Sequence, residues 1–172
     1  MQLKTERLFI RKIVFDDWIS IKRIWDDFRM SEYAQYDIPH KSEDEDIKKQ
    51  ISKWEKANNE EKHLFFAVCL EEEVIGYIDF HSTPDGYDSG YCFDSAYHGK
   101  GYAKESYKAL IEYLAEKGIK RLTAGTAINN IPSVRLLKSL GFKQVGEEKV
   151  SFYKDDDGND IYFDGGLFEL MI

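Results

Sequence analysis

The stretch Tyr97-His98-Gly99-Lys100-Gly101-Tyr102-Ala103-Lys104-Glu105-Ser106 lies at the centre of the predicted fold of this 172-residue chain. It follows a strand-like run, residues 90–93, and opens a strongly helical run over Tyr102–Lys117. Two glycines one residue apart predict a tight turn where the backbone approaches another group closely. The first amides of the following helix have no partner within the helix and lie at the positive end of its dipole. The stretch therefore predicts a site for a phosphate or pyrophosphate, and the alternative is a plain strand-to-helix turn.

Patterns on either side of this stretch predict further strands and helices. Before it, we expect a strand over 3–14, a helix over Trp18–Arg29 capped by Asp16-Asp17, a helix from the capping box Ser42–Glu45 to about Ala57, and strands over His63–Leu70, Val74–Phe80 and Tyr87–Asp94. After it, we expect a strand over Arg121–Ala127, a helix with Pro132 in its first turn and Gly141 at its end, and a hairpin of residues 142–152 and 161–170. Gly76 inside a strand predicts a bulge or a close backbone approach. The strand–helix–strand order over residues 87–127 implies a parallel pair of strands.

Two blocks of the sequence carry a family resemblance. The first, His98–Ala103, resembles the acetyl-CoA pyrophosphate loop of the GNAT superfamily of N-acetyltransferases, Gln/Arg-x-x-Gly-x-Gly/Ala, with Gly101 and Ala103 at the two small positions and His98 where Gln or Arg is usual. The second, Asn129–Phe142, resembles the Asn-x-x-Ser helix of that superfamily, which ends in Leu-Gly-Phe. The Asn-x-x-Ser pattern of the second block resembles the RimJ/RimL-like branch, which acetylates ribosomal-protein N-termini.

The resemblance implies a mixed α+β fold and a cofactor. We expect one domain over residues 1–172, with one twisted, mostly antiparallel sheet of about seven strands, a central parallel pair and about four flanking helices. The co-substrate implied is acetyl-CoA, and no metal is expected. The residues that would hold it are His98, Gly99, Lys100, Gly101, Tyr102 and Ala103 at the pyrophosphate, Cys92, Phe93 and Asp94 along the pantetheine arm and thioester, and Asn130 and Ser133 at the second block. Asn130 either contacts a pantetheine amide, caps its helix, or does both.

Acetyl transfer from a thioester to an amine requires a base for the ammonium and a partner for the departing thiolate. Asp88 matches a strand position where related enzymes often carry Glu, and it is the predicted base; the alternative is a solvated acid at a strand end. Asp79 and His81 on the neighbouring strand are weaker candidates for that role. Leu137 stands where many family members have a proton-donating Tyr. The resemblance implies Ser133 as the donor instead, and the alternative is a helix-capping or third-position serine.

The segment Met30–His40 breaks the helical pattern and is rich in aromatic residues. Loops often carry binding residues, so Tyr33 and Tyr36 are predicted to flank an acceptor while Glu32 or Asp37 meets its positive charge. The alternative is that the tyrosines pin the loop to the domain. The formal charge of −8 argues against a nucleic-acid partner and favours a cationic acceptor, or it serves solubility alone. The expected acceptor is a protein N-terminus or a small amine such as a polyamine, amino acid or aminoglycoside.

Other features set the expected class of protein. No run of about 18 apolar residues predicts a membrane span, and residues 1–7 do not resemble a secretion signal. Cys69 and Cys92 lie in strand-like runs and are predicted to be buried thiols in a reducing compartment. We therefore expect a cytoplasmic enzyme, monomeric or homodimeric. The alternative function is a non-catalytic GNAT-fold module that binds acyl-CoA and acts as a sensor.

Overall fold

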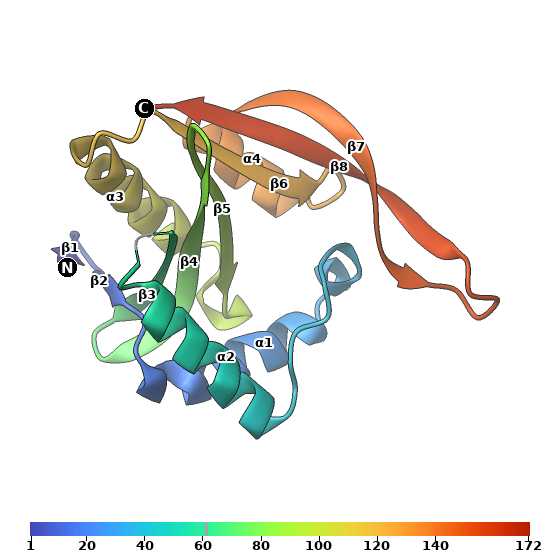
Figure 1. Cartoon of the computed structure of the whole chain (residues 1–172), viewed down its shortest axis with the longest axis horizontal. Helices are drawn as coiled ribbons and strands as arrows, with labels where there is room; N and C mark the ends of the chain where they lie inside the picture. The colour runs from blue at the N-terminus through green and yellow to red at the C-terminus, as the bar shows by residue number, and fades with distance from the viewer. Residues whose placement is uncertain (61) are drawn as a thin grey trace.

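A computed structural model describes residues 1–60 and 62–172 of the chain. Its centre is a twisted eight-stranded sheet in the order β1-β2-β3-β4-β5-β6-β8-β7 (Figure 1). Neighbouring strands are antiparallel except for β5 and β6, which are parallel. The strands are β1 Gln2–Lys4, β2 Phe9–Lys12, β3 His63–Leu70, β4 Glu73–Thr83, β5 Gly86–Phe93, β6 Arg121–Ala127, β7 Lys143–Lys154 and β8 Asp160–Met171.

Helices cover both faces of the sheet (Figure 1). They are α1 Trp18–Arg29, α2 Asp44–Ala57, α3 Tyr102–Glu116 and α4 Ile131–Ser139, with short 3-10 turns η1 Phe15–Asp17, η2 Glu32–Tyr36 and η3 Ser95–Tyr97. The helices α1 and α2 pack on one face, and α3 and α4 pack on the other. In the part of the chain that the structure describes, no helix is long and apolar enough to cross a membrane.

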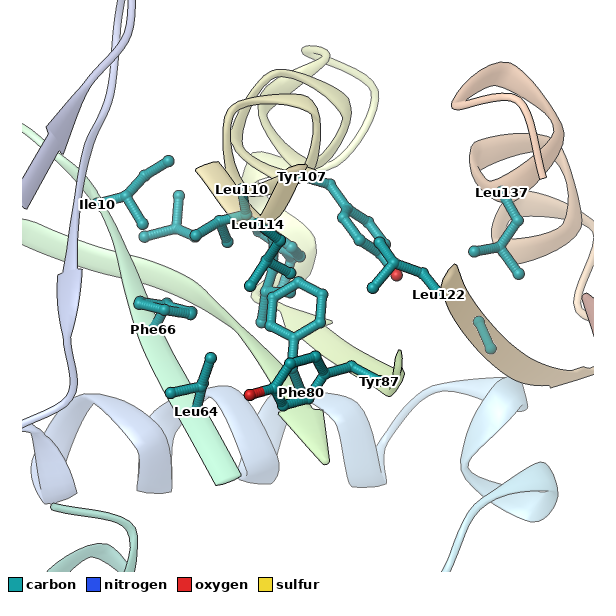
Figure 2. Close-up of a cluster of buried hydrophobic side chains, with 14 of the residues drawn as sticks. Ile10, Leu64, Phe66, Phe80, Tyr87, Tyr107, Leu110, Leu114, Leu122 and Leu137 are labelled. Atoms are coloured by element: carbon teal, nitrogen blue, oxygen red, sulfur yellow. The ribbon is translucent and has the colours of Figure 1, made fainter. Parts of the chain in front are cut away.

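Strand β3 shows how the sequence builds two cores at once. Successive side chains of a strand point to opposite faces, so Phe66 joins the α3 side while Phe65 joins the α1–α2 side. Figure 2 shows the α3 side, where Leu110 and Leu114 point down onto Phe66 and its neighbours in the sheet. Burial on both faces explains why this strand is apolar along nearly its whole length.

A bulge and a close approach coincide at Gly76, as the sequence predicts. The register of β3 and β4 shifts so that Val68 pairs with Gly76 while Cys69 pairs with Val74, which leaves Ile75 as the extra residue. A Cβ atom on Gly76 would lie 2.2 Å from the ring of Phe93 on β5. Any larger residue at this position would displace Phe93.

Three sequence predictions about element ends are wrong. The strand predicted over residues 3–14 is two short strands, because the chain turns where the Thr5 amide donates to the Leu8 carbonyl at 2.9 Å. Helix α2 begins at Asp44 with Glu43 as its N-cap and has no side-chain cap, so Ser42 does not form a capping box. Asp17 does not cap α1 through its side chain either. Its carboxylate instead accepts two hydrogen bonds from the Arg11 guanidinium.

Candidate active site

The parallel strands β5 and β6 separate soon after they meet. They pair at Tyr87 with Leu122 and at Asp88 with Thr123, and no later pair follows among the described residues. Past this point they line a cleft of about 1160 Å³, which we call the central cleft. Its walls are the rest of β5, the end of β6, the loop before α3, the start of α4, the segment around η2, and the β7–β8 hairpin.

Most of the residues singled out in the sequence line this cleft. They are Cys92, Phe93, His98, Gly99, Gly101, Tyr102, Ala103, Asn130 and Ser133 from the cofactor prediction, and Glu32, Tyr33, Tyr36 and Asp37 from the acceptor prediction. Asp88, Asp94 and Lys100 do not line it. Asp94 accepts a hydrogen bond from the Ala96 amide at 2.9 Å and so caps η3. Lys100 donates from Nζ to the Ala96 carbonyl at 3.0 Å.

The glycine loop has the backbone conformation that an anion cradle requires. Gly99 and Gly101 have φ of +72° and +82°, in the left-handed region that favours glycine. Gly101 is the N-cap of α3, so the unpaired amides of the first helical turn follow it directly. His98 Nε2 lies 2.8 Å from the Phe93 carbonyl oxygen; because a carbonyl oxygen only accepts, Nε2 carries the proton and donates the hydrogen bond. This bond ties the loop to the end of β5.

Arg7, which the sequence interpretation missed, braces the same loop. Its Nη1 donates to the Lys100 carbonyl at 2.9 Å, its Nε donates to Glu105 at 2.7 Å, and its guanidinium lies 4.6 Å from the centre of the Tyr102 ring. Burial acts against the charge of Glu105, but hydrogen bonds from Thr5 and Arg7 outweigh it and lower the pKa of Glu105. The start of the chain thus fixes the start of α3.

The beginning of α4 presents a hydroxyl to the cleft. Asn130 is the N-cap and accepts from the Ser133 amide at 3.3 Å, so the capping alternative for Asn130 is confirmed. Ser133 is the third residue of the helix, and its Oγ lies 2.5 Å from the hydroxyl of Tyr91 on β5. Burial raises the pKa of Tyr91 to about 12. Leu137 is fully buried in the core on the α3 side.

The predicted base lies outside the cleft wall. Asp88 is at the point where β5 and β6 still pair, and its carboxylate accepts from the Thr123 hydroxyl at 2.7 Å. Asp79 is 3.0 Å from His81 Nε2, and this hydrogen bond raises the pKa of His81. The structure therefore does not bring Asp88, Asp79 or His81 together with Ser133 in the wall of the central cleft.

The opposite wall is acidic and aromatic. Tyr36 packs against Phe163 of β8 with ring centres 5.3 Å apart, so it both pins the η2 segment and lines the cleft. Asp37 accepts from the Ile38 amide at 2.7 Å, and partial burial raises its pKa. His40 lies behind it, with Nε2 3.6 Å from the Asp37 carboxylate.

Comparison with known proteins identifies the family to which this fold and its cleft belong. A family model described as an acetyltransferase (GNAT) domain matches residues 7–143. "Uncharacterized N-acetyltransferase YnaD" of Bacillus subtilis (strain 168) is 32% identical over 168 residues, which cover 95% of each chain. The chain belongs to the GNAT family of N-acetyltransferases.

Solved GNAT structures share the whole fold. An acetyltransferase of the GNAT family from Bacillus anthracis is 28% identical, with a TM-score of 0.79 over 99% of this chain and 98% of that one. RimL, a ribosomal L7/L12 alpha-N-protein acetyltransferase solved with coenzyme A, is 17% identical, with a TM-score of 0.85 over 100% of this chain and 98% of its own. The predicted family and fold class are confirmed.

Proposed function

We propose that this GNAT enzyme transfers the acetyl group of acetyl-CoA to a primary amine, with the amine attacking the thioester directly. The observation that carries the proposal is the continuity of the central cleft. One cavity joins the glycine loop and the start of α4 to the acidic, aromatic wall of η2 and the hairpin. A cofactor bound at one end and an amine bound at the other would therefore meet inside it.

The cofactor end suits a long, polar thioester. The glycine loop offers amides at the positive end of α3 to a pyrophosphate. Beyond Asp88, the edge of β5 that faces β6 has no strand partner among the described residues. Backbone groups on this edge need hydrogen bonds, and the amide groups of a pantetheine arm can supply them. Backbone amides on the same edge would stabilise the negative charge that develops on the thioester carbonyl oxygen.

The acceptor end suits a cation. Glu32 and Asp37 supply carboxylates, and Tyr33 and Tyr36 supply ring faces that attract an ammonium group. We assign Asp37 ahead of Asp88 as the group that takes the ammonium proton, directly or through water. Asp37 lines the cleft, and its raised pKa makes it the stronger base. Ser133 is the proposed hydrogen-bond donor to the departing sulfur.

The test is thiol release from acetyl-CoA over a panel of acceptors: polyamines, amino acids, aminoglycosides and peptides with free N-termini. We expect turnover with at least one of them, and a loss of kcat in Asp37→Asn that exceeds the loss in Asp88→Asn. A matched surface change, Asp85→Asn, should have no effect. Binding of acetyl-CoA without turnover on any amine would contradict the proposed reaction, and equal loss in both acid variants would contradict the choice of base.

A further inference from the structure

A pair of hydroxyl groups bridges the central cleft. Tyr91 extends from β5 toward α4, and its hydroxyl is 2.5 Å from Ser133 Oγ. Both residues line the cleft. Because β5 and β6 have already separated at this level, the pair joins β5 to the helix that follows β6. The bridge therefore crosses the gap between the two strands, where the proposed function places the thioester arm.

The direction of this hydrogen bond decides whether the Ser133 proton is available to a group in the cleft. A serine hydroxyl has one proton and two acceptor sites. If Tyr91 donates to Ser133 Oγ, the serine proton is free to point into the cleft; if Ser133 donates, that proton is spent. The Ser133 amide donates to the Asn130 side chain, so this helix cap fixes the position of the Ser133 backbone.

Tyr91 is held against the core and keeps the proton that it needs to act as the donor. Its ring packs against Tyr107 with centres 5.7 Å apart, and Tyr107 in turn hydrogen-bonds to Ser89 in the core. Burial keeps the Tyr91 phenol protonated, because its pKa of about 12 lies far above neutral pH. An alkyl thiol titrates near 8.5, so the Tyr91 phenol would not give up its proton to a thiolate. A hydrogen bond from Tyr91 to Ser133 would instead strengthen the hydrogen bond that Ser133 donates to the thiolate.

We propose that Tyr91 is a positioning residue that turns the Ser133 hydroxyl toward the sulfur of coenzyme A. This inference rests on the proposed function. As the amine nitrogen bonds to the acetyl carbon, the carbon–sulfur bond breaks and its electron pair stays on sulfur. Ser133 donates a hydrogen bond to that thiolate, and Tyr91 donates to Ser133. The protons released by the amine pass to the base and to solvent, so neither hydroxyl group changes its protonation state.

The test compares the binding of coenzyme A with that of desulfo-coenzyme A, which lacks the sulfur atom, by calorimetry at pH 7 and pH 9.5. We expect the wild type to prefer coenzyme A at pH 9.5, where the thiolate forms, by about tenfold. Ser133→Ala should remove this preference. Tyr91→Phe should remove most of it, and the double variant should match Ser133→Ala. Ser133→Thr, which keeps a hydroxyl group, should restore it.

Tyr113→Phe, a phenol removed outside the cleft, is the matched control and should keep the full preference. Binding of desulfo-coenzyme A at wild-type strength shows that each variant is folded. A Tyr91→Phe variant with the wild-type preference at pH 9.5 would overturn the inference while leaving the proposed function intact. Failure of the wild type to bind either compound would overturn the proposed function, and this inference with it.

Discussion

Gly101 holds a left-handed backbone conformation at the residue where the glycine loop becomes helix α3. A side chain there costs about 1–2 kcal/mol, because its Cβ crowds the carbonyl oxygen of the backbone. It would also stand 3.4 Å from the Arg7 guanidinium. Gly101 therefore carries a conformational demand and, in the proposed function, a demand from cofactor binding, and an experiment can separate the two.

We predict that Gly101→Ala lowers the free energy of unfolding by about 1–2 kcal/mol and weakens binding of acetyl-CoA. The matched control is Gly118→Ala. Gly118 has φ of +85° at the far end of α3, and a Cβ there would meet nothing within 4 Å. It should lose similar stability in denaturant titration yet bind acetyl-CoA at wild-type strength in calorimetry. Equal affinity in both variants would contradict the role of the glycine loop.

Two histidines, His40 and His81, are predicted to titrate on opposite sides of pH 6.5. His40 lies next to Asp37 in the wall formed by Glu32, Tyr33, Tyr36 and Asp37, which we call the acceptor wall after its proposed role. The hydrogen bond that His81 donates to the Asp79 carboxylate raises the pKa of His81, whereas burial lowers the pKa of His40. Protonated His81 thus stabilises the fold below pH 6.5, and this contribution is lost as the pH rises through its folded-state pKa. Neutral His40 contributes above pH 6.5, and its contribution is lost as the pH falls.

NMR titration of the histidine Cε1 protons checks this order. Asp79→Asn should lower the pKa of His81 much more than that of His40, since the direct hydrogen bond reaches only His81. A His40 that titrates above His81 in the wild type would show that the packing of the acceptor wall differs from the structure.

At the scale of elements, the link between β1 and β2 acts as a brace for α3. Arg7 contacts the Lys100 carbonyl, Glu105 and the Tyr102 ring together. We predict that Arg7→Ala weakens acetyl-CoA binding about tenfold, because the loop loses the group that fixes its carbonyl. Arg7→Lys should recover only part of the affinity, since an ammonium group cannot reproduce the planar set of contacts.

The matched control for Arg7 is Arg121→Ala. Arg121 also forms ion pairs, with Asp85 and Glu169, but these partners lie outside the glycine loop. It should leave acetyl-CoA binding unchanged in the same calorimetric assay. Equal weakening by both substitutions would assign the effect of Arg7 to general stability instead of the loop.

Elements and site residues with local causes could be predicted from the sequence. Helix α3 begins where the glycines end, and Asn130 caps the amide three residues later. Contacts between distant segments could not be predicted: Arg7 meets a partner 98 residues away, and Tyr91 meets one 42 residues away. The position of Asp88 outside the cleft could not be predicted either, because the sequence predicts a parallel pair of strands but not the residue at which the two strands separate.

At the scale of the whole molecule, the acceptor wall is held together by contacts between η2 and the β7–β8 hairpin, whose contacting residues Ala34 and Tyr153 are 119 residues apart in the chain. The Tyr153 hydroxyl of β7 donates to the Ala34 carbonyl of η2 at 3.3 Å, and Tyr36 packs on Phe163 nearby. The hairpin reaches past the body of the domain to make these contacts (Figure 1). The wall therefore depends on how well the hairpin is held.

We predict that Tyr153→Phe raises KM for the amine several-fold, about 1 kcal/mol, because one hydrogen bond that holds the wall is lost. The Kd of acetyl-CoA should not change. Tyr162→Phe is the control on the same hairpin, since Tyr162 is 61% exposed and its hydroxyl donates to Asp160, two residues away, at 3.4 Å. Steady-state kinetics with an acceptor found in the panel checks both, and a change in acetyl-CoA affinity in Tyr153→Phe would contradict the division of the cleft.

The division of the central cleft also bears on how such an enzyme can diversify. The proposed cofactor side comes from the middle of the chain, from β5 through α4, whereas the proposed acceptor side comes from η2 before it and the hairpin after it. With this division, random substitution confined to η2 and the hairpin would change which amine is accepted while the residues proposed to bind acetyl-CoA stay constant. A lineage built on this plan can exchange one substrate for another without passing through a form that has lost its acetyl donor.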